Sequence, residues 1–240
     1  MTKKIFLTFD MDWACDEILK DFYELLCAMD VCGTINVTHN TKLLEMFRKE
    51  ERIELGVHPN YNMLLDGTGS GQSFEDVLRD CVRIVPEAVT VRSHSLTSGS
   101  KISSIYARYG LKYDLNMFYP IFEGDKIRCF RDVCGGGVKI PFLFEDDIYL
   151  MSPEKRTIEY YLNNTFTAPR VFNFHPIHIF LNSDSMECYE NARKYFQDYQ
   201  KLKCFRNTVT SGIRDYFVTL ITIGKEKGYE FLKIKDGNWE

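Results

Sequence analysis

The sequence predicts an α/β protein in which parallel strands form a barrel or a doubly wound sheet. Short apolar or alternating runs recur along the 240 residues, and stretches with helical periodicity separate them. Strand and helix alternate about seven times, which is typical of parallel strands joined by right-handed crossovers. A chain of this length with 45% apolar residues suits one compact domain over residues 1–240.

The first half of the chain carries the clearest patterns. Apolar runs bounded by polar or turn residues predict strands over residues 4–9, 33–38 and 53–58. Amphipathic patterns between and after them predict helices over residues 16–29, 41–50 and 73–84. Ser73 is the expected N-cap of the third helix, and Asp76 three positions later comes close to a capping box.

The second half continues the alternation. Strands are expected over residues 88–94, 113–118, 138–144, 171–175 and 229–234, and helices over 100–109, 153–163, 185–203 and 210–227. The Gly-rich segment 66–71 lacks the Gly-Lys-Ser/Thr ending of a phosphate loop. A flexible loop over a site is therefore the better interpretation of that segment.

Composition excludes several classes of protein. The net charge of −4 and the pI near 5.8 give no basic surface for nucleic acid. The longest unbroken apolar run, Leu25 to Met29, is far too short to cross a bilayer. The apolar stretch after Lys3 and Lys4 ends by Asp10, so we expect no export signal and a cytoplasmic protein. The 8 cysteines form no Cys-x-x-Cys pair, and we expect most of them to be reduced core thiols.

Unusual polar residues cluster at the carboxyl ends of the predicted strands. Asp10 and Asp12 end the first strand, and histidines end four others, at His39, His58, His94 and His175, with His178 just after the last. In parallel α/β folds these strand ends lie on one face, where sites are built. A lone histidine at a strand end is more often structural, but this coincidence favours a functional site.

Asp10 and Asp12 are two positions apart, so in an extended segment their side chains point to the same side. Two carboxylates that close require a neutralising cation in a dry site. Arg92 can supply a guanidinium fork for Asp10, and Asp12 with imidazoles can hold a transition metal. The alternative is that Asp10 caps the first helix region and Asp12 is solvated.

The order of these motifs resembles the polysaccharide deacetylase family, carbohydrate esterase family four, and within it the branch of surface-polysaccharide and O-antigen loci. The resemblance extends over most of the chain and is carried by four segments, Thr8 to Asp12, Glu54 to Asn60, Val91 to Ser95 and Phe172 to Pro176. It implies a distorted (β/α)7 barrel with the active site at the carboxyl ends of the strands.

The resemblance also implies roles for single residues. Asp10 matches the catalytic base, Arg92 the arginine paired with it, and His175 the late histidine that acts as general acid. Asp12 matches the metal-binding aspartate and His58 the first metal histidine. The segment from Glu145 to Asp147 resembles the acidic stretch that tunes the late histidine, although an exposed acidic loop is an equal alternative.

One departure concerns the second metal histidine of the family. At the matching position this chain has Asn62 or Met63, and asparagine is a poor ligand for a transition metal. We expect His94 to provide the third ligand, with His39 as second choice. The implied cofactor is a divalent transition metal, zinc first, with iron, cobalt, manganese or nickel as alternatives.

The implied activity is metal-dependent hydrolysis of N-acetyl or related acyl groups on amino sugars of a polysaccharide or its precursor. Trp13, Tyr61 and Tyr119 could offer aromatic surface to a sugar ring.

Two other functions fit part of the sequence. In a haloacid-dehalogenase-like phosphatase, Asp10 would be the nucleophile, Asp12 the acid/base and Asp146 with Asp147 the magnesium ligands, but Ala14 stands where that family has Thr or Val. A non-catalytic sugar-binding barrel would explain the missing second histidine.

Overall fold

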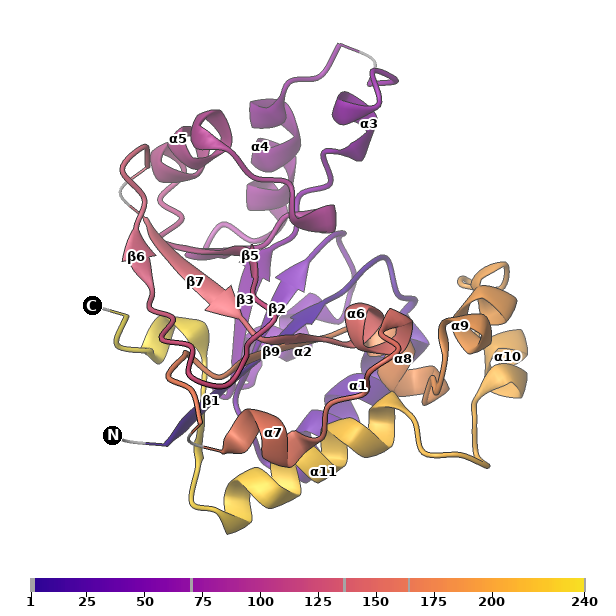
Figure 1. The fold of residues 1–240 in the computed structure, drawn as a ribbon. Helices are drawn as coiled ribbons and strands as arrows, with labels where there is room; N and C mark the ends of the chain where they lie inside the picture. The colour runs from indigo at the N-terminus through magenta and orange to yellow at the C-terminus, as the bar shows by residue number, and fades with distance from the viewer. Residues whose placement is uncertain (1–2, 70, 136, 164, 240) are drawn as a thin grey trace.

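A curled, mostly parallel sheet organises the chain. The computed structural model describes residues 3–69, 71–135, 137–163 and 165–239 (Figure 1). Neighbouring strands follow the order β6-β7-β5-β4-β3-β2-β1-β9-β8, and only the β6–β7 pair is antiparallel within this path. The strands are β1 (Lys4–Asp10), β2 (Gly33–Val37), β3 (Ile53–Val57), β4 (Thr90–Val91), β5 (Tyr113–Phe118), β6 (Phe130–Arg131), β7 (Val138–Phe142), β8 (Phe144–Glu145), β9 (Val171–Phe174) and β10 (Glu230–Leu232).

The predicted strand at 138–144 joins the two sides of the curled sheet, because its two halves pair with different strands. Phe142 in β7 lies opposite Phe118 of β5, whereas Phe144 in β8 lies opposite Phe172 of β9. With β1 to β5 and β9, this segment gives seven positions around a distorted barrel. The prediction of an α/β barrel with parallel strands is therefore confirmed.

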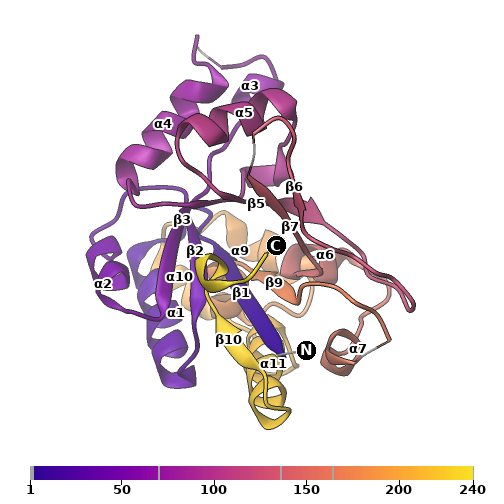
Figure 2. The ribbon, with the colours of Figure 1, turned by 90° about the vertical axis from the view of Figure 1, so that its left-hand side faces the viewer.

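Helices cover the outside of the sheet. They are α1 (Asp16–Met29), α2 (Leu44–Lys49), α3 (Asn62–Leu65), α4 (Phe74–Ile84), α5 (Ser100–Arg108), α6 (Asp146–Met151), α7 (Ile158–Leu162), α8 (Pro176–Leu181), α9 (Met186–Arg193), α10 (Tyr199–Leu202) and α11 (Ile213–Glu226). Figure 1 shows α1 and α11 along one side and α9 with α10 as a projection. Figure 2 shows β10 beside β1, where the two strands pair in parallel.

Alternation in β1 separates the outer core from the barrel interior. Phe9 points outward, and its ring packs 4.6 Å from Phe22 of α1 and 5.8 Å from Phe217 of α11, measured between centroids. Thr8 and Asp10 consequently point inward, because successive side chains of a strand face opposite sides. The packing of Phe9 thus fixes the direction in which Asp10 faces.

Several predicted elements are shorter or divided in the structure. The capping box of Ser73 and Asp76 starts α4, and α1 has the predicted bounds. The expected strand over 88–94 pairs only at Thr90–Val91, because the chain then turns into a short 3-10 helix, His94–Leu96, with left-handed backbone at Ser95 and Leu96. The expected helix over 185–203 is divided into α9 and α10, and that over 153–163 contracts to α7.

No helix within the described ranges is long and apolar enough to span a bilayer. All eight cysteines are free, but only Cys81 is buried, so the expectation that most are core thiols is wrong. The expectation of aromatic sugar contacts is also wrong for Tyr61, whose side chain is fully buried.

Candidate active site

Asp10 lies at the end of β1, and both of its carboxylate oxygens accept hydrogen bonds. Asn36, its register partner on β2, donates an amide hydrogen bond to Oδ1 over 2.8 Å. Asn173 on β9 donates one to Oδ2 over 2.9 Å. Both asparagine side chains are buried, so the two strands that flank β1 fix the plane of the Asp10 carboxylate.

Arg92 supplies the positive charge for this buried carboxylate. It follows β4, is fully buried, and its guanidinium lies 4.4 Å from the ring centroid of Phe142. Its Nη1 donates to Asp10 Oδ1 over 3.2 Å and to Thr8 Oγ1 over 3.0 Å. Burial raises the pKa of Asp10, but Arg92 and then His58 and His175 outweigh burial, and the pKa of Asp10 is lowered.

Asp12 enters the site from a strained turn and not from an extension of β1. Asp12 has φ +40° and Trp13 has φ +57°, both in the left-handed region that non-glycine residues rarely adopt. The turn is closed by a hydrogen bond from Ala14 N to Met11 O and by one from Trp13 N to Thr38 Oγ1. The expectation that Asp12 lies in an extended segment is wrong, although its carboxylate does face the same pocket as Asp10.

Asp12, His58 and His94 bring three ligand atoms together. Asp12 Oδ1 lies 3.2 Å from His58 Nε2 and 3.3 Å from His94 Nδ1, yet neither contact has hydrogen-bond geometry. Within the part of the chain that the structure describes, Oδ1 is buried without a hydrogen-bond partner. Tetrahedral ligands about 2.0–2.1 Å from a zinc ion stand about 3.3–3.4 Å apart. The spacing and the unpartnered oxygen both fit a small cation held by these residues.

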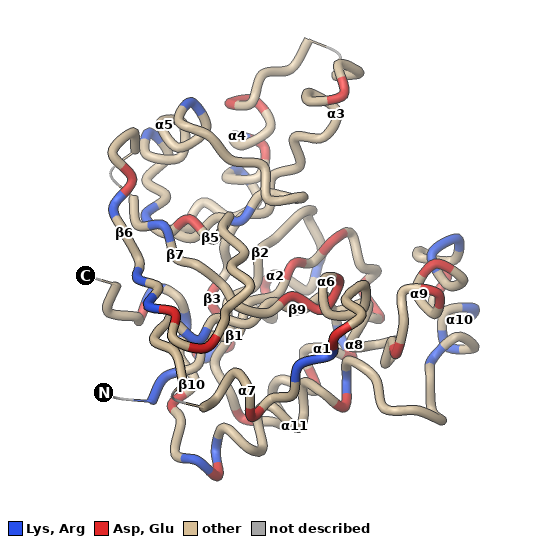
Figure 3. The backbone as a smooth tube through the Cα atoms, in the orientation of Figure 1, with Lys and Arg blue, Asp and Glu red and all other residues tan. Residues whose placement is uncertain are grey.

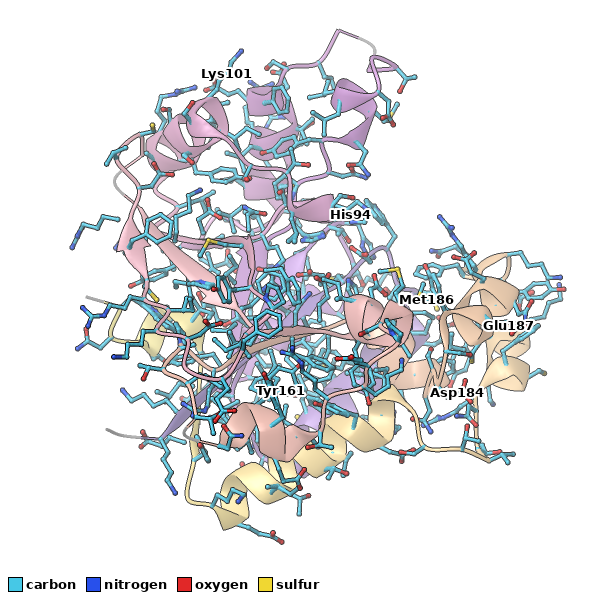
Figure 4. The ribbon with its side chains drawn as sticks, in the orientation of Figure 1. His94, Lys101, Tyr161, Asp184, Met186 and Glu187 are labelled. Atoms are coloured by element: carbon cyan, nitrogen blue, oxygen red, sulfur yellow. The ribbon has the colours of Figure 1, made fainter. Side chains whose placement is uncertain are left out.

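The surroundings of the two imidazoles suit this role. Nδ1 of His58 faces Asp10 Oδ1 at 3.5 Å, on the side away from Asp12, an orientation common for metal-bound histidines. His94 lies on the turn after β4 (Figure 4), and its ring packs 5.3 Å from Trp13. The nearby carboxylate of Asp12 raises the pKa of His94.

The alternative third ligands lie elsewhere. Nδ1 of His39 pairs with Thr38 Oγ1 at 2.9 Å, and the amide of Asn62 donates to Ser95 Oγ at 3.2 Å. Among the described histidines, cysteines and acidic residues, His39 does not join the group of Asp12 and His58. Of the three candidates from the sequence, the structure brings His94 to the other two ligands.

His175 lies across the pocket, at the end of β9, and is oriented by Asp146. Its Nδ1 is 2.6 Å from Asp146 Oδ1, and its Nε2 is 3.6 Å from Asp12 Oδ2 and 4.0 Å from Asp10 Oδ2. Burial lowers the pKa of His175, but Asp146 and Asp147 outweigh burial and raise it well above the usual value. Its Nε2 faces the space between the carboxylates of Asp10 and Asp12.

The asparagines around Asp10 and the contacts of His178 are not among the site features predicted from the sequence. Asn36 and Asn173 were detectable as amides inside predicted strand segments. His178 lies 2.5 Å from Asp147 through Nε2 and 3.0 Å from Ser183 Oγ through Nδ1. In the acidic stretch at the start of α6, whose residues are red in Figure 3, Asp146 and Asp147 thus contact histidines, and the stretch is not an exposed loop.

Known proteins share this architecture. The model of the family WbmS-like polysaccharide deacetylases matches residues 7–193. The crystal structure of WbmS from Bordetella bronchiseptica, assigned as a polysaccharide deacetylase involved in O-antigen biosynthesis, is 35% identical with a TM-score of 0.81, over 91% of this chain and 90% of that chain. The comparison with curated proteins gave no match.

More distant structures share the fold. A protein of Mycobacterium smegmatis assigned as a polysaccharide deacetylase is 16% identical with a TM-score of 0.56, over 98% of this chain and 89% of that chain. The Xyl-CE4 domain of a xylanase from the hindgut metagenome of Trinervitermes trinervoides is 13% identical with a TM-score of 0.52, over the same shares. The family match over most of the chain and the 35% identity to WbmS establish that this chain belongs to the WbmS-like polysaccharide deacetylases.

Proposed function

We propose that this protein is a metal-dependent hydrolase that removes N-acetyl or related acyl groups from amino sugars of a surface polysaccharide or its precursor. The observation that carries the proposal is one arrangement: three convergent ligand atoms with the Asp10 carboxylate on one side and the His175 imidazole on the other. The assignment of the relative WbmS to O-antigen biosynthesis supports the substrate class.

Asp12, His58 and His94 would hold the metal, and one carboxylate with two imidazoles is a donor set suited to zinc. A divalent metal bound there would polarise the acyl carbonyl and stabilise the negative charge that develops on its oxygen. Three protein ligands leave room for substrate, as hydrolytic sites require.

Asp10 is the general base of this proposal. Among the described residues, Oδ1 accepts hydrogen bonds from Asn36 and Arg92, whereas Oδ2 accepts one from Asn173 alone. Oδ2 therefore keeps a free acceptor position, on the oxygen nearest His175. A water between Oδ2 and the carbonyl would lose its proton to this atom as it attacks.

His175 is the general acid. An amine is a poor leaving group from a tetrahedral intermediate unless it receives a proton. Asp146 holds Nδ1 and leaves Nε2 facing the pocket, so Nε2 would donate that proton to the departing nitrogen.

The phosphatase interpretation has less support. It needs the carboxylates of Asp146 and Asp147 free to bind magnesium, but Asp146 contacts His175 with both oxygens and Asp147 contacts His178. The non-catalytic alternative depended on an incomplete ligand set, and the position of His94 weakens that argument.

The proposal is tested by acetate release from methyl glycosides of N-acetylglucosamine and N-acetylgalactosamine. Protein loaded with zinc should release acetate, protein treated with a chelator should not, and zinc should restore the activity. The His39→Ala variant is the matched control and should behave like the wild type. Undiminished turnover in metal-free protein would refute metal dependence.

A further inference from the structure

Glu145 is a carboxylic acid at the edge of the site that the proposed reaction does not use. It ends β8 opposite Asn173 of β9, and one of its oxygens lies within 4.8 Å of ligand atoms of both Asp10 and His175. Its two neighbours in sequence, Asp146 and Asp147, are occupied by histidines. In the described part of the chain, by contrast, the Glu145 carboxyl meets no hydrogen-bond donor at bonding distance.

Glu145 is one of the residues that line a cavity of about 140 Å³. Glu145 lines it together with the aromatic side chains of Phe118, Phe144, Tyr149 and Tyr161. Tyr161 extends from α7 toward the sheet (Figure 4). Ser152, Glu154 and Arg156 also line the cavity. Apolar rings with a few polar groups that fix orientation are the usual lining of a small-molecule site. The volume is well below the ~300–1,000 Å³ of pockets for drug-sized ligands, which limits the occupant to about one sugar ring.

The position of Glu145 decides which half of the substrate it would meet. The acyl carbonyl faces Asp12, His58 and His94, and the leaving nitrogen faces Nε2 of His175. Glu145 groups with Asp10 and His175 and not with the three proposed ligands. Atoms beside Glu145 therefore belong to the amine half of the amide, the sugar ring, and not to the acyl group.

We propose that Glu145 and the adjoining cavity form the subsite for the amino-sugar ring, with the Glu145 carboxyl bonded to the hydroxyl next to the acylated nitrogen. This inference rests on the proposed function. The substrate must then carry a free hydroxyl next to the acylated nitrogen, one that is neither linked to another sugar nor acylated. Glu145 is then a specificity-determining residue and takes no part in proton transfer.

The environment of the carboxyl is consistent with this role. Burial raises the pKa of Glu145 to about 7. Near neutral pH the group therefore exists partly as the acid, which can donate a hydrogen bond to a sugar oxygen as well as accept one.

The test compares wild type with Glu145→Gln and Glu145→Leu, and uses Glu159→Gln, an exposed carboxylate on α7, as matched control. Two measurements are made on each. Calorimetry gives Kd for the methyl glycosides of glucosamine and galactosamine and for their 3-deoxy counterparts. Kinetics gives kcat and KM for the corresponding N-acetyl compounds, and the metal content is assayed in each preparation.

We expect Glu145→Leu to weaken amine binding about 10-fold or more, the usual effect of losing a hydrogen bond to a charged or strongly polar group. KM should rise likewise while kcat and metal content change little, and Glu145→Gln should keep part of the affinity. The 3-deoxy compounds should bind wild type more weakly, and this penalty should vanish in Glu145→Leu, because both changes remove the same contact.

Three results would overturn the subsite: a Kd in Glu145→Leu equal to that of wild type, a 3-deoxy penalty that persists in that variant, or no measurable amine binding to wild type. A collapse of kcat with unchanged KM would also overturn it, since Glu145 would then act in the reaction. Failure of wild type to release acetate while the amine still binds in a Glu145-dependent way would refute the proposed function alone.

Discussion

Asp146 contacts His175 with both carboxylate oxygens: Oδ1 lies 2.6 Å from the imidazole Nδ1, and Oδ2 accepts a hydrogen bond from the backbone N–H of His175 over 2.7 Å. Asp146 is itself fully buried as the first residue of α6. One carboxylate thus sets both the position of the His175 backbone and the direction of its ring. The free Nε2 consequently points at the space between Asp10 and Asp12.

Asp146→Asn should impair amide hydrolysis without removing metal, because an amide side chain supports a protonated His175 poorly. The expected loss of kcat is on the order of 10²–10⁴, the range of a general acid, and His175→Ala should fall in the same range. Hydrolysis of an aryl acetate, whose leaving group needs no proton, should decline far less. Equal loss of both activities together with loss of metal would instead make His175 a ligand.

His58→Ala and His94→Ala should each lose metal, because each removes one of three donors. We expect the dissociation constant for zinc to rise at least on the order of 10², since changes outside the ligand shell already cost 10–100-fold. His39→Ala should retain one zinc per chain. Elemental analysis after dialysis against a weak chelator measures the zinc content of the three variants. Full zinc occupancy in His94→Ala would show that the third ligand is another residue.

Arg92→Met should destabilise metal-free protein by about 3–5 kcal/mol, because it leaves the Asp10 carboxylate buried without its cation. Adding Asp10→Asn to Arg92→Met should recover part of that loss, since the unpaired charge is then removed. Urea unfolding of the two single variants and the double variant gives the coupling free energy. Strictly additive losses would mean that the two charges do not interact.

The lowered pKa of Asp10 predicts an acid dependence of stability. A carboxyl whose pKa falls below the ordinary value of 3.8 on folding stabilises the protein above that value, and the contribution is lost as pH falls through the lower folded pKa. The free energy of unfolding of Asp10→Asn, measured on metal-free protein, should thus fall less steeply with acid below about pH 4. Identical slopes for the variant and wild type would contradict the direction of the shift.

Some elements of the fold could be predicted from the sequence, and others could not. Helix α1 and the capping box of α4 follow from local signals, and the parallel barrel follows from the alternation of strand and helix. Local pattern cannot show that residues 138–145 pair with β5 in one half and β9 in the other, because both partners are distant in sequence. Nor does it show the strained turns at Asp12 and Ser95, whose conformations tertiary contacts impose.

Some residues of the candidate site could likewise be placed from the sequence, and others could not. The positions of Asp10, His58 and His175 could be predicted from the strand ends, because parallel strands share one carboxyl-terminal face. His94 lies on a 3-10 turn, so its approach to Asp12 depends on the fold of that turn and on its packing against Trp13. The clamp of Asn36 and Asn173 on Asp10 depends on strand order, which a single sequence does not contain.

In the proposed function, Asp10 acts as the base of a metal-dependent deacetylation. The most direct measurement is acetate release from N-acetyl amino-sugar glycosides by wild type and Asp10→Asn at equal zinc content. We expect turnover by wild type and a loss on the order of 10²–10⁴ in the variant, with zinc still bound, because the change removes a proton acceptor and no ligand. Unimpaired acetate release by Asp10→Asn, or a phosphorylated Asp10 during magnesium-dependent turnover of aryl phosphates, would show that Asp10 is not the base of a deacetylation.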